Sequence, residues 1–331
     1  MRTGRCISCG LCAATFRAPG DATRVSIVYD DAVGYYRPRV DGWVEGSDPG
    51  AFVCPGERMD MPALSMLEYG AQPDDAVMGR YVAVRAVQST DRSDRKLAAS
   101  GGAIPAILRH LFTENRIDAA YCVVQEPGRR DGIGRLIRSV SEIGRIHGSF
   151  YHPPDFGHEL PQLFAEQSRF AFVGLPCQVA GLRMAMAADP ALRRRCVAVI
   201  AAFCGGYNTF RGIAWYLERF GVAADEVAEI RYRDGAWPGT ITVQTKDGRT
   251  IRDIPRVRGN TRWGVLRYLS AFQGSWMLKR CRICPDQIGD FADIAVGDPH
   301  LPRFRMRVEA DGGAGWSAML TRTETGERLV R

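Results

Sequence analysis

The sequence lacks an apolar run long enough to span a bilayer, and no apolar signal segment stands at its N-terminus. We therefore expect a cytoplasmic protein with no membrane partner. It also lacks a basic stretch with interleaved aromatic side chains, and its arginines are scattered or adjoin acids, as in DRSDRK and RYRDG. Nucleic acid is thus not an expected partner despite the net charge of +7, which an anionic small molecule, a protein partner or an ordinary solvated surface explains as well.

Histidine is scarce, with five residues in the chain, and no catalytic triad is visible. His147 and His152 bracket the stretch GSFY, where they could donate a proton or serve a structural or surface role. No internal repeat or low-complexity segment interrupts the 331 residues. A composition of 46% hydrophobic and 24% charged residues is that of a globular protein, and the length suits two or three domains.

Cysteine, by contrast, is abundant, with ten residues. Cys6, Cys9 and Cys12 are separated by two residues each, so their thiolates can wrap around one corner of a cubane iron–sulfur cluster, and Gly10 relieves backbone crowding in the turn. In a bacterial ferredoxin run, a fourth cysteine followed by proline would come three residues later. Here the Cys-Pro pair appears only at Cys54, which indicates a remote fourth ligand.

Zinc ligation and disulfide bonding stay open as alternatives for these cysteines. Paired C-x2-C motifs also make structural zinc sites, although three cysteines at equal intervals and a distant Cys-Pro fit a cubane better than a zinc ribbon. A disulfide framework fits less well, because the chain is larger than those that need such stapling.

Hydrophobic periodicity predicts a mixed α/β (α+β) fold. A strand and turn are expected within 25–40, strands at 81–87, 119–125, 169–175 and 196–204, helices at 104–115, 179–187, 210–221 and 263–273, and two or three antiparallel strands between 227 and 254. We expect a loop-rich, half-ferredoxin-like segment over residues 1–75, followed by a mixed-sheet core whose two parts span 76–160 and 161–331.

Four later cysteines could also meet in space. Cys177 and Cys204 come at the ends of successive predicted strands, beside glycine and proline, and such strand ends can be neighbours in a wound sheet. Cys281 and Cys284 form a close pair. Cysteines inside strands are usually buried small hydrophobes, and two are read that way: Cys122 and Cys196.

The order of the motifs resembles a known family. The half-ferredoxin opening with GYYRP and VCPG is followed by SGGAIPAIL, HGSFY, VGLPCQVAGLR, FCGG, RYRDGAWPG and CRICPD…DIAVGD. This series, which covers nearly the whole chain, is similar to the family of coenzyme F420 hydrogenase/dehydrogenase beta subunits. That family includes deazaflavin-reducing subunits of archaeal hydrogenases and formate dehydrogenases, and ferredoxin-dependent reductases of chlorophyll intermediates.

The resemblance implies FAD in a flavin-binding core and one or two 4Fe–4S clusters. By motif match, the N-terminal cluster would be held by Cys6, Cys9, Cys12 and Cys54, and the one nearer the flavin by Cys177, Cys204, Cys281 and Cys284. The family often has a histidine where this chain has Gly205, so no side-chain role is carried over there. The chain also ends sooner than most relatives.

Glycine turns are the expected flavin contacts. Ser100, Gly101 and Gly102 precede a predicted helix, where free N–H groups and the helix dipole attract phosphate. An ordinary N-cap serine is the alternative, and the family context favours the FAD pyrophosphate. A second set of contacts is expected at Gly148, Ser149 and Tyr151.

The motif RYRDGAWPG offers further contacts. Arg231 and Arg233 could pair with phosphate or stabilise a reduced, anionic flavin, and Trp237 could stack on an aromatic ring. In a simple hairpin the same residues would be surface arginines and a packed tryptophan. Asp298 either accepts a hydrogen bond near the second cluster or flavin, or starts a turn before proline.

Together these features predict an iron–sulfur flavoprotein oxidoreductase. Electrons would pass from a ferredoxin-like donor through the clusters to FAD and on to a small organic acceptor. The alternatives are a coenzyme F420 oxidoreductase and a non-catalytic electron-transfer subunit of a larger complex. Partner subunits or a homo-oligomer are compatible with each, and no catalytic side chain is assigned.

Overall fold

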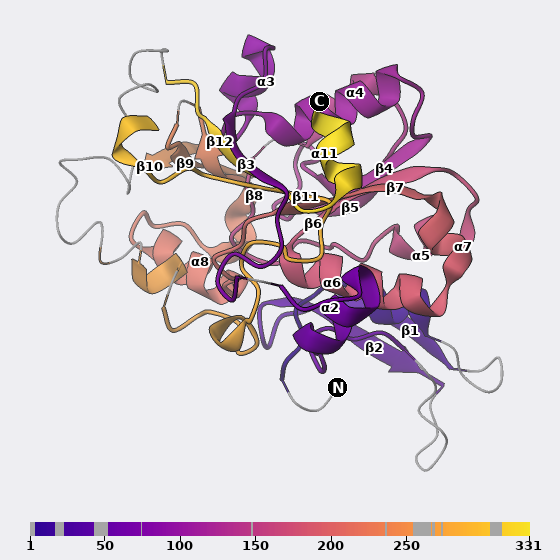
Figure 1. The fold of residues 1–331 in the computed structure, drawn as a ribbon. Coiled ribbons are helices and arrows are strands. Elements are labelled where there is room, and N and C mark those ends of the chain that lie inside the picture. The colour runs from indigo at the N-terminus through magenta and orange to yellow at the C-terminus, as the bar shows by residue number, and fades with distance from the viewer. Residues whose placement is uncertain are drawn as a thin grey trace.

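A mixed sheet runs through the centre of the protein (Figure 1), and within the described part of the chain it has seven strands in the order β3-β12-β11-β7-β6-β4-β5. The computed structural model describes residues 4–16, 23–42, 52–73, 75–146, 148–235, 237–253, 266, 269–272, 274–304 and 313–331. The strands are β3 (Ala83–Val87), β4 (Ala119–Val124), β5 (Ile133–Ile137), β6 (Phe170–Gly174), β7 (Cys196–Ala202), β11 (Ile294–Gly297) and β12 (Ser317–Thr321).

The four central strands β11, β7, β6 and β4 are parallel, while β5 and β12 pair with them in the antiparallel sense. β3 pairs antiparallel with β12 and forms one edge. Parallel strands are covered on both faces, and their sequences accordingly read as continuous apolar runs. This confirms the mixed α/β class expected from the sequence.

Helices cover both faces of this sheet (Figure 1). One core contains residues of α1 (Leu11–Thr15), α2 (Met61–Tyr69), α5 (Leu160–Ala165), α6 (Pro176–Ala188) and α7 (Pro190–Arg195). The other contains residues of α4 (Ala103–Thr113), the 3-10 helix η1 (Val140–Arg145) and α11 (Glu324–Val330). Because side chains alternate along a strand, Tyr121 of β4 packs in the first core and Cys122 in the second.

Two smaller sheets flank the main one. β8 (Val227–Asp234), β9 (Thr240–Thr245) and β10 (Thr250–Asp253) form an antiparallel sheet that shares a core with α8 (Phe210–Glu218). β1 (Arg24–Asp30) and β2 (Tyr35–Asp41) form a hairpin beside α1. Three further short helices with described bounds are α3 (Arg92–Leu97), η2 (Ala224–Glu226) and η3 (Cys281–Ile283).

The cysteine-rich N-terminal segment packs directly on the main domain. A Cβ added to Gly10 would lie 2.3 Å from the Gly157 Cα, so the two backbones touch there. A Cβ on Gly181 of α6 would lie 2.3 Å from Leu11 and 2.9 Å from Pro55. Glycine is therefore needed on both sides of this contact, and it brings the turn of the first cysteine group against α6.

The strands expected at 81–87, 119–125, 169–175 and 196–204 and the helices expected at 104–115, 179–187 and 210–221 are confirmed. The strand and turn expected within 25–40 belong to the β1–β2 hairpin, whose second strand was not expected, and the antiparallel strands expected after 227 are β8 to β10. Most of the helix expected at 263–273 lies outside the described residues. The domain boundaries at residues 75 and 160 stay a prediction.

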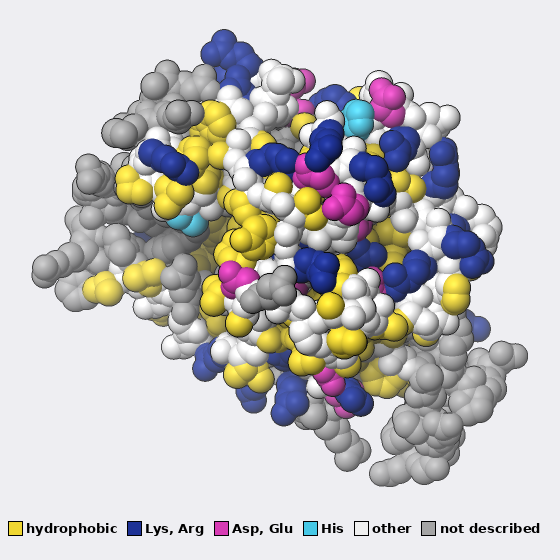
Figure 2. Space-filling view, viewed as in Figure 1, with side chains coloured by type: hydrophobic (Ala, Val, Ile, Leu, Met, Phe, Trp, Pro, Cys, Tyr) yellow, Lys and Arg dark blue, Asp and Glu magenta, His cyan; other side chains and the backbone are white. Residues whose placement is uncertain are grey.

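On the face shown in Figure 2, Lys and Arg side chains are spread singly, with Asp and Glu among them. Among the described residues, Arg85 Nη2 lies 2.7 Å from Glu327 Oε1, and Arg109 Nη2 lies 2.9 Å from Asp94 Oδ1. In both pairs the carboxylate is buried and the arginine partly exposed, so each acid offsets the charge of its arginine. Among the described residues, no helix has the length and apolar character to cross a membrane.

A buried arginine ties the C-terminal part of the chain to the loop after Cys284. Arg322 is fully buried, and its guanidinium donates to the Ile288 carbonyl at 2.9 Å and lies 3.5 Å from Asp290 Oδ1. Burial and the neighbouring Asp286 nevertheless raise the pKa of Asp290 to about 6, although Arg322 opposes this shift. The ionised Asp290 carboxylate therefore destabilises the fold.

Replacing Asp290 with asparagine should consequently raise the free energy of unfolding by about 2 kcal/mol at pH 7.5. The penalty is absent below the unfolded pKa of about 4, grows as pH rises towards the folded pKa of about 6, and is complete above it. Urea unfolding of both proteins at pH 7.5 and about pH 4 measures this difference. An equal effect at the two pH values would contradict the assigned cause.

Candidate functional site

The first four candidate thiols line one small cavity. Cys6, Cys9, Cys12 and Cys54 border it together with apolar side chains from the β1–β2 hairpin. Two residues between the first cysteines have left-handed backbones, Ser8 with φ 62° and Gly10 with φ 71°, so the chain winds around the cavity as the spacing predicted. The Ser8 N–H donates to Cys6 Sγ at 3.4 Å.

Burial raises the pKa of the Cys6, Cys9 and Cys12 thiols, and the charge of a neighbouring thiolate raises it further. The pKa of Cys12 rises to about 12 through burial and through the charges of Cys6 and Cys54. The pKa of Cys9 lies well above its usual value for the same reasons, with Cys12 as the largest contributing charge. Several thiolates can coexist here only if cations compensate their charge, which is the condition that metal ligation meets.

The second four candidate thiols also lie together. β6 and β7 are neighbouring parallel strands, so Cys177, in the first turn of α6 directly after β6, comes beside Cys204, which follows β7. The prediction that these two follow adjacent strand ends is confirmed. Cys281 of η3 packs on the same loop, because a Cβ on Gly206 would lie 3.3 Å from the Cys281 Cβ.

Electrostatic coupling ties this second group together and to the first. Burial, and then the charges of Cys204, Cys281, Cys9 and Cys284, raise the pKa of Cys177 well above its usual value. Burial and the charges of Cys281 and Cys284 raise the pKa of Cys204 to about 12. Because Cys9 belongs to the first group, the two groups adjoin across the contact of α1 with α6.

Within the described residues, no three His, Cys, Asp or Glu side chains converge as one metal ion would require. A cubane binds each thiolate through a separate iron atom, whereas a zinc ion draws all its ligands to one point. The absence of such a group therefore bears on a site for a single ion and not on a cubane cluster. The assignment of the eight cysteines as cluster ligands stays a prediction.

A second cavity of about 920 Å³ opens beside the second group. It lies at the carboxyl ends of β6, β7 and β11, where ligands bind in wound α/β sheets, and its size is at the upper end of the range for cofactor sites. Cys204 is part of its wall. Buried polar atoms in that wall lack a partner among the described residues, which indicates that a polar ligand fits: Arg233 Nη2, Trp237 Nε1 and Asp298 Oδ1.

The glycine turn before α4 borders this cavity through Ser100 and Gly102. The Ser100 hydroxyl donates to the Trp316 carbonyl at 2.6 Å, and the Gly101 N–H donates to Ser317 Oγ at 2.9 Å. Any Cβ on Gly101 would lie 2.7 Å from backbone atoms, so this glycine serves close packing. The helical N–H groups nearest the cavity that have no intrahelical partner are those of Ala103 and Ile104, since Pro105, the third residue of α4, has no N–H.

The predicted contacts Gly148, Ser149 and Tyr151 also border the cavity. Gly148 has φ 100° and open space around its Cα, as a loop that faces a ligand would. The Tyr151 ring stacks on Tyr232 with centroids 4.8 Å apart. His147 lies outside the described residues.

The two arginines of RYRDGAWPG, Arg231 and Arg233, lie in different surroundings. Arg233 borders the cavity, whereas the Arg231 side chain is 53% exposed and lies 2.7 Å from Glu229 Oε1. In a regular strand, Arg231 and Arg233 would point to the same face of the sheet, because side chains two residues apart do so. The register between β8 and β9 shifts between Arg231 and Asp234, and this irregularity explains their different surroundings. For Arg231 the surface alternative raised by the sequence describes the contacts better.

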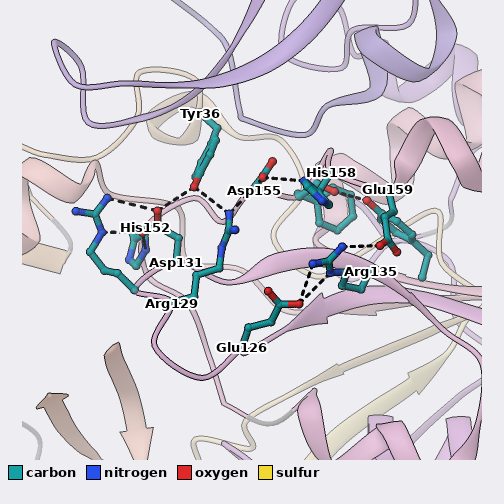
Figure 3. Close-up of polar contacts among 12 residues, drawn as sticks. Tyr36, Glu126, Arg129, Asp131, Arg135, His152, Asp155, His158 and Glu159 are labelled. Carbon is teal, nitrogen blue, oxygen red and sulfur yellow. Dashed lines mark hydrogen bonds and ion pairs between the residues drawn. The ribbon is translucent and has the colours of Figure 1, made fainter. Parts of the chain in front are cut away.

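His152 lies in a buried network that the sequence did not reveal (Figure 3). Its Nε2 lies 2.9 Å from Asp131 Oδ1 and its Nδ1 lies 2.5 Å from the Tyr232 hydroxyl, while the Tyr36 hydroxyl donates to Asp131 Oδ2 at 3.0 Å. Tyr232 in turn stacks on Tyr151. Of the two roles considered for this histidine, the structural one fits: it holds the loop that carries the cavity residue Tyr151.

Other wall residues were missed by sequence reasoning. Gln178 in the first turn of α6, Tyr207 after β7 and Ser317 of β12 all border the cavity. No motif marks Ser317, since its partner Gly101 is 216 residues away. Gln178 and Tyr207 follow Cys177 and Cys204 closely, and this proximity was the available signal. Cys122 borders the cavity too, although its side chain is only 2% exposed and packs in a core as expected.

Two family models match this chain, both for the beta subunits of coenzyme F420 hydrogenase/dehydrogenase. The model of their N-terminal part matches residues 84–156, and the model of their C terminus matches residues 167–331. The chain belongs to this family. The two matches include the glycine turn before α4, the second cysteine group and the hairpin with Arg233.

Curated relatives in this family are distant in sequence. The F subunit of the F(420)H(2) dehydrogenase of Methanosarcina mazei is 24% identical over 263 residues, which are 77% of this chain, and the alignment spans 64% of that relative's length. The beta subunit of the coenzyme F420 hydrogenase of Methanothermobacter thermautotrophicus is 22% identical over 266 residues, covering 77% of this chain and 82% of the relative.

A solved structure shows the same fold. A chain of the F420-reducing NiFe hydrogenase complex from Methanosarcina barkeri superposes with a TM-score of 0.57 at 18% identity, covering 77% of this chain and 80% of that one. At this identity the similarity extends to the fold alone.

Proposed function

We propose that this chain is an iron–sulfur flavoprotein oxidoreductase. Electrons would enter from a ferredoxin-like donor, pass through two 4Fe–4S clusters and FAD, and leave on a small organic acceptor. The observation that carries the proposal is the order in space: Cys9 of the first group and Cys177 of the second pack in the same apolar core, and the second group borders the large cavity through Cys204. A cytoplasmic location belongs to the same proposal.

The residues present suit these groups. The eight cysteines supply two sets of four thiols, which is the ligand number of a cubane. FAD, when bound, supplies the exchange between single electrons and a hydride equivalent. The chain would hold its phosphates at the first turn of α4 and near Gly148 and Ser149, and would line its ring with Tyr151 and Arg233.

A second candidate is a coenzyme F420 oxidoreductase. The names of the relatives favour it, because two of them are a dehydrogenase of the reduced coenzyme and a coenzyme F420 hydrogenase. Both are subunits, so a non-catalytic electron-transfer subunit with partner subunits is the third candidate. A homo-oligomer would be compatible with each.

Anaerobic purification with measurement of iron, sulfide and flavin tests the proposal. We expect about eight iron atoms and one FAD per chain, and an optical spectrum with contributions from both. About four iron atoms would remove one cluster, and zinc without flavin would overturn the proposal.

Turnover then separates the candidates. A lone chain that reduces an organic acceptor with reduced ferredoxin supports the enzyme, and exchange of hydride with coenzyme F420 supports the second candidate. Reduction of the flavin with no turnover of either acceptor supports an electron-transfer subunit.

A further inference from the structure

A buried ion pair joins the two sheets at the wall of the large cavity. Arg233 near the end of β8 donates from Nη1 to Asp298 Oδ2 at 2.6 Å, and Asp298 follows β11. The side chains are 8% and 9% exposed. Arg233 Nε also donates to the Pro238 carbonyl at 3.1 Å, so the guanidinium is held from two sides.

Each partner of this pair keeps one unused polar atom. Arg233 Nη2 and Asp298 Oδ1 are buried and have no hydrogen-bond partner within the described residues, and both residues border the cavity. Trp237 Nε1, on the turn after β8, is a further buried donor without such a partner. Leaving such atoms unpaired is unfavourable, so a ligand that satisfies them gains affinity and selectivity.

The charges decide what kind of ligand fits. Because Asp298 neutralises Arg233, the pair offers no net positive charge, and a phosphate at Nη2 would also meet the carboxylate. A neutral group with a carbonyl oxygen beside an N–H is complementary, since Arg233 can only donate and an ionised Asp298 can only accept. The anionic partners considered for Arg233 from the sequence therefore fit less well than a neutral edge.

The site is rigid enough to discriminate. Gly239 has φ 88°, and a Cβ there would lie 2.6 Å from the Arg233 Cα, so the turn after β8 presses on the arginine backbone. A Cβ on Gly297, next to Asp298, would lie 2.0 Å from the Phe203 ring. Both members of the pair thus come from backbone segments fixed by packing, which preorganises the donor and the acceptor.

We propose that Arg233 and Asp298 together bind the lactam edge, a carbonyl beside an N–H, of the planar ring that the cavity holds. Arg233 Nη2 donates to the ring carbonyl, and the ring N–H donates to Asp298 Oδ1. The inference rests on the proposed function, which puts FAD in this cavity. The isoalloxazine ring carries this edge at its N3–H, and the ring of a deazaflavin acceptor carries the same edge.

Methylation of N3 removes the N–H and gives a direct test. The flavin-free protein would be titrated with FAD and with 3-methyl-FAD, and the two dissociation constants compared. We expect the wild type to bind 3-methyl-FAD at least about tenfold more weakly, the size of effect expected for a lost hydrogen bond to a charged group. If the pair only ties the two sheets together, the two ligands bind equally.

The variant Asp298→Asn tests whether the preference for FAD depends on the carboxylate. The amide oxygen would turn to Arg233 Nη1, leaving its NH2 group towards the ring N–H, so FAD should bind more weakly and the preference over 3-methyl-FAD should disappear. Glu229→Gln is the matched control: it removes a carboxylate paired with Arg231 outside the cavity and should leave both constants unchanged. If Asp298→Asn fails to fold, the wild-type comparison still decides.

A second arm identifies which ring is bound. If FAD and 3-methyl-FAD bind alike, the rate of flavin oxidation by a deazaflavin acceptor is compared with the rate for its N3-methyl analogue. If the wild type prefers the unmethylated acceptor and Asp298→Asn does not, Arg233 and Asp298 bind the lactam edge of the acceptor. Normal FAD binding with no preference in either arm overturns the inference and leaves the proposed function standing. A protein that binds no FAD removes both.

Discussion

Replacing Cys281 with serine is expected to lower the iron content of the anaerobically purified protein from about eight to about four atoms per chain. Cys281 lies against the loop that carries Cys204, and its charge is among those that raise the pKa of Cys177. If the four thiols hold one cubane, removing one thiolate leaves it with three ligands. Reduction of the flavin by an external donor should slow as well, since Cys204 of the same group borders the cavity.

Cys196→Ser is the suitable control for this loss. Cys196 begins β7 at the end of the strand away from Cys204, packs against the core and does not border the cavity. Cys122→Ser should retain iron too. Because Cys122 borders the cavity, however, this variant could also change the rate of flavin reduction, and it is a poorer control for that measurement. Equal loss of iron in the Cys281 and Cys196 variants would contradict the division of the cysteines into ligands and core residues.

Gly10→Ala should destabilise the protein by about 2 to 5 kcal/mol. The added methyl would lie 2.3 Å from the Gly157 Cα, so two backbone segments must move apart, and overpacking of this kind costs about 1–3 kcal/mol. A left-handed backbone adds about 1–2 kcal/mol for a residue with a Cβ. Urea unfolding measures the loss, and the iron of the first cluster should fall with it.

Gly128→Ala separates these two contributions. Gly128 has φ 69°, nearly the value of 71° at Gly10, but no atom lies within 4 Å of its added Cβ. This variant should therefore show only the backbone penalty of about 1–2 kcal/mol and keep its iron. Similar destabilisation in the two variants would mean that the contact of Gly10 with Gly157 does not hold the N-terminal segment in place.

Local sequence patterns were sufficient to predict the central strands of the sheet. β4, β6 and β7 are short apolar runs bounded by turn residues, and buried parallel strands have that signature. Their order along the chain also put Cys177 and Cys204 at neighbouring strand ends, because α6 and α7 return the chain from the end of β6 to the start of its parallel neighbour β7, so that both strands end at the same edge. The spacing of Cys6, Cys9 and Cys12 consists of two short intervals, so it predicts a shared ligand group without any knowledge of the fold.

Local patterns could not predict contacts between residues that are far apart in the sequence. The partner of Gly101 is Ser317, the partner of Arg233 is Asp298, and neither follows from residues nearby in sequence. The different surroundings of Arg231 and Arg233 depend on an irregularity in the pairing of β8 with β9, which alternation along one strand cannot indicate.

The position of β12 in the sheet has a consequence for synthesis of the protein. β12, residues Ser317–Thr321, lies between β3 and β11, and β3 has no other neighbour in this sheet within the described residues. On the ribosome, β3 must therefore wait for more than two hundred residues to be made before it can pair. Such a nascent chain exposes an unpaired strand for many seconds at synthesis rates of about 5–20 residues per second, and chaperone binding near residues 83–87 would protect it from aggregation.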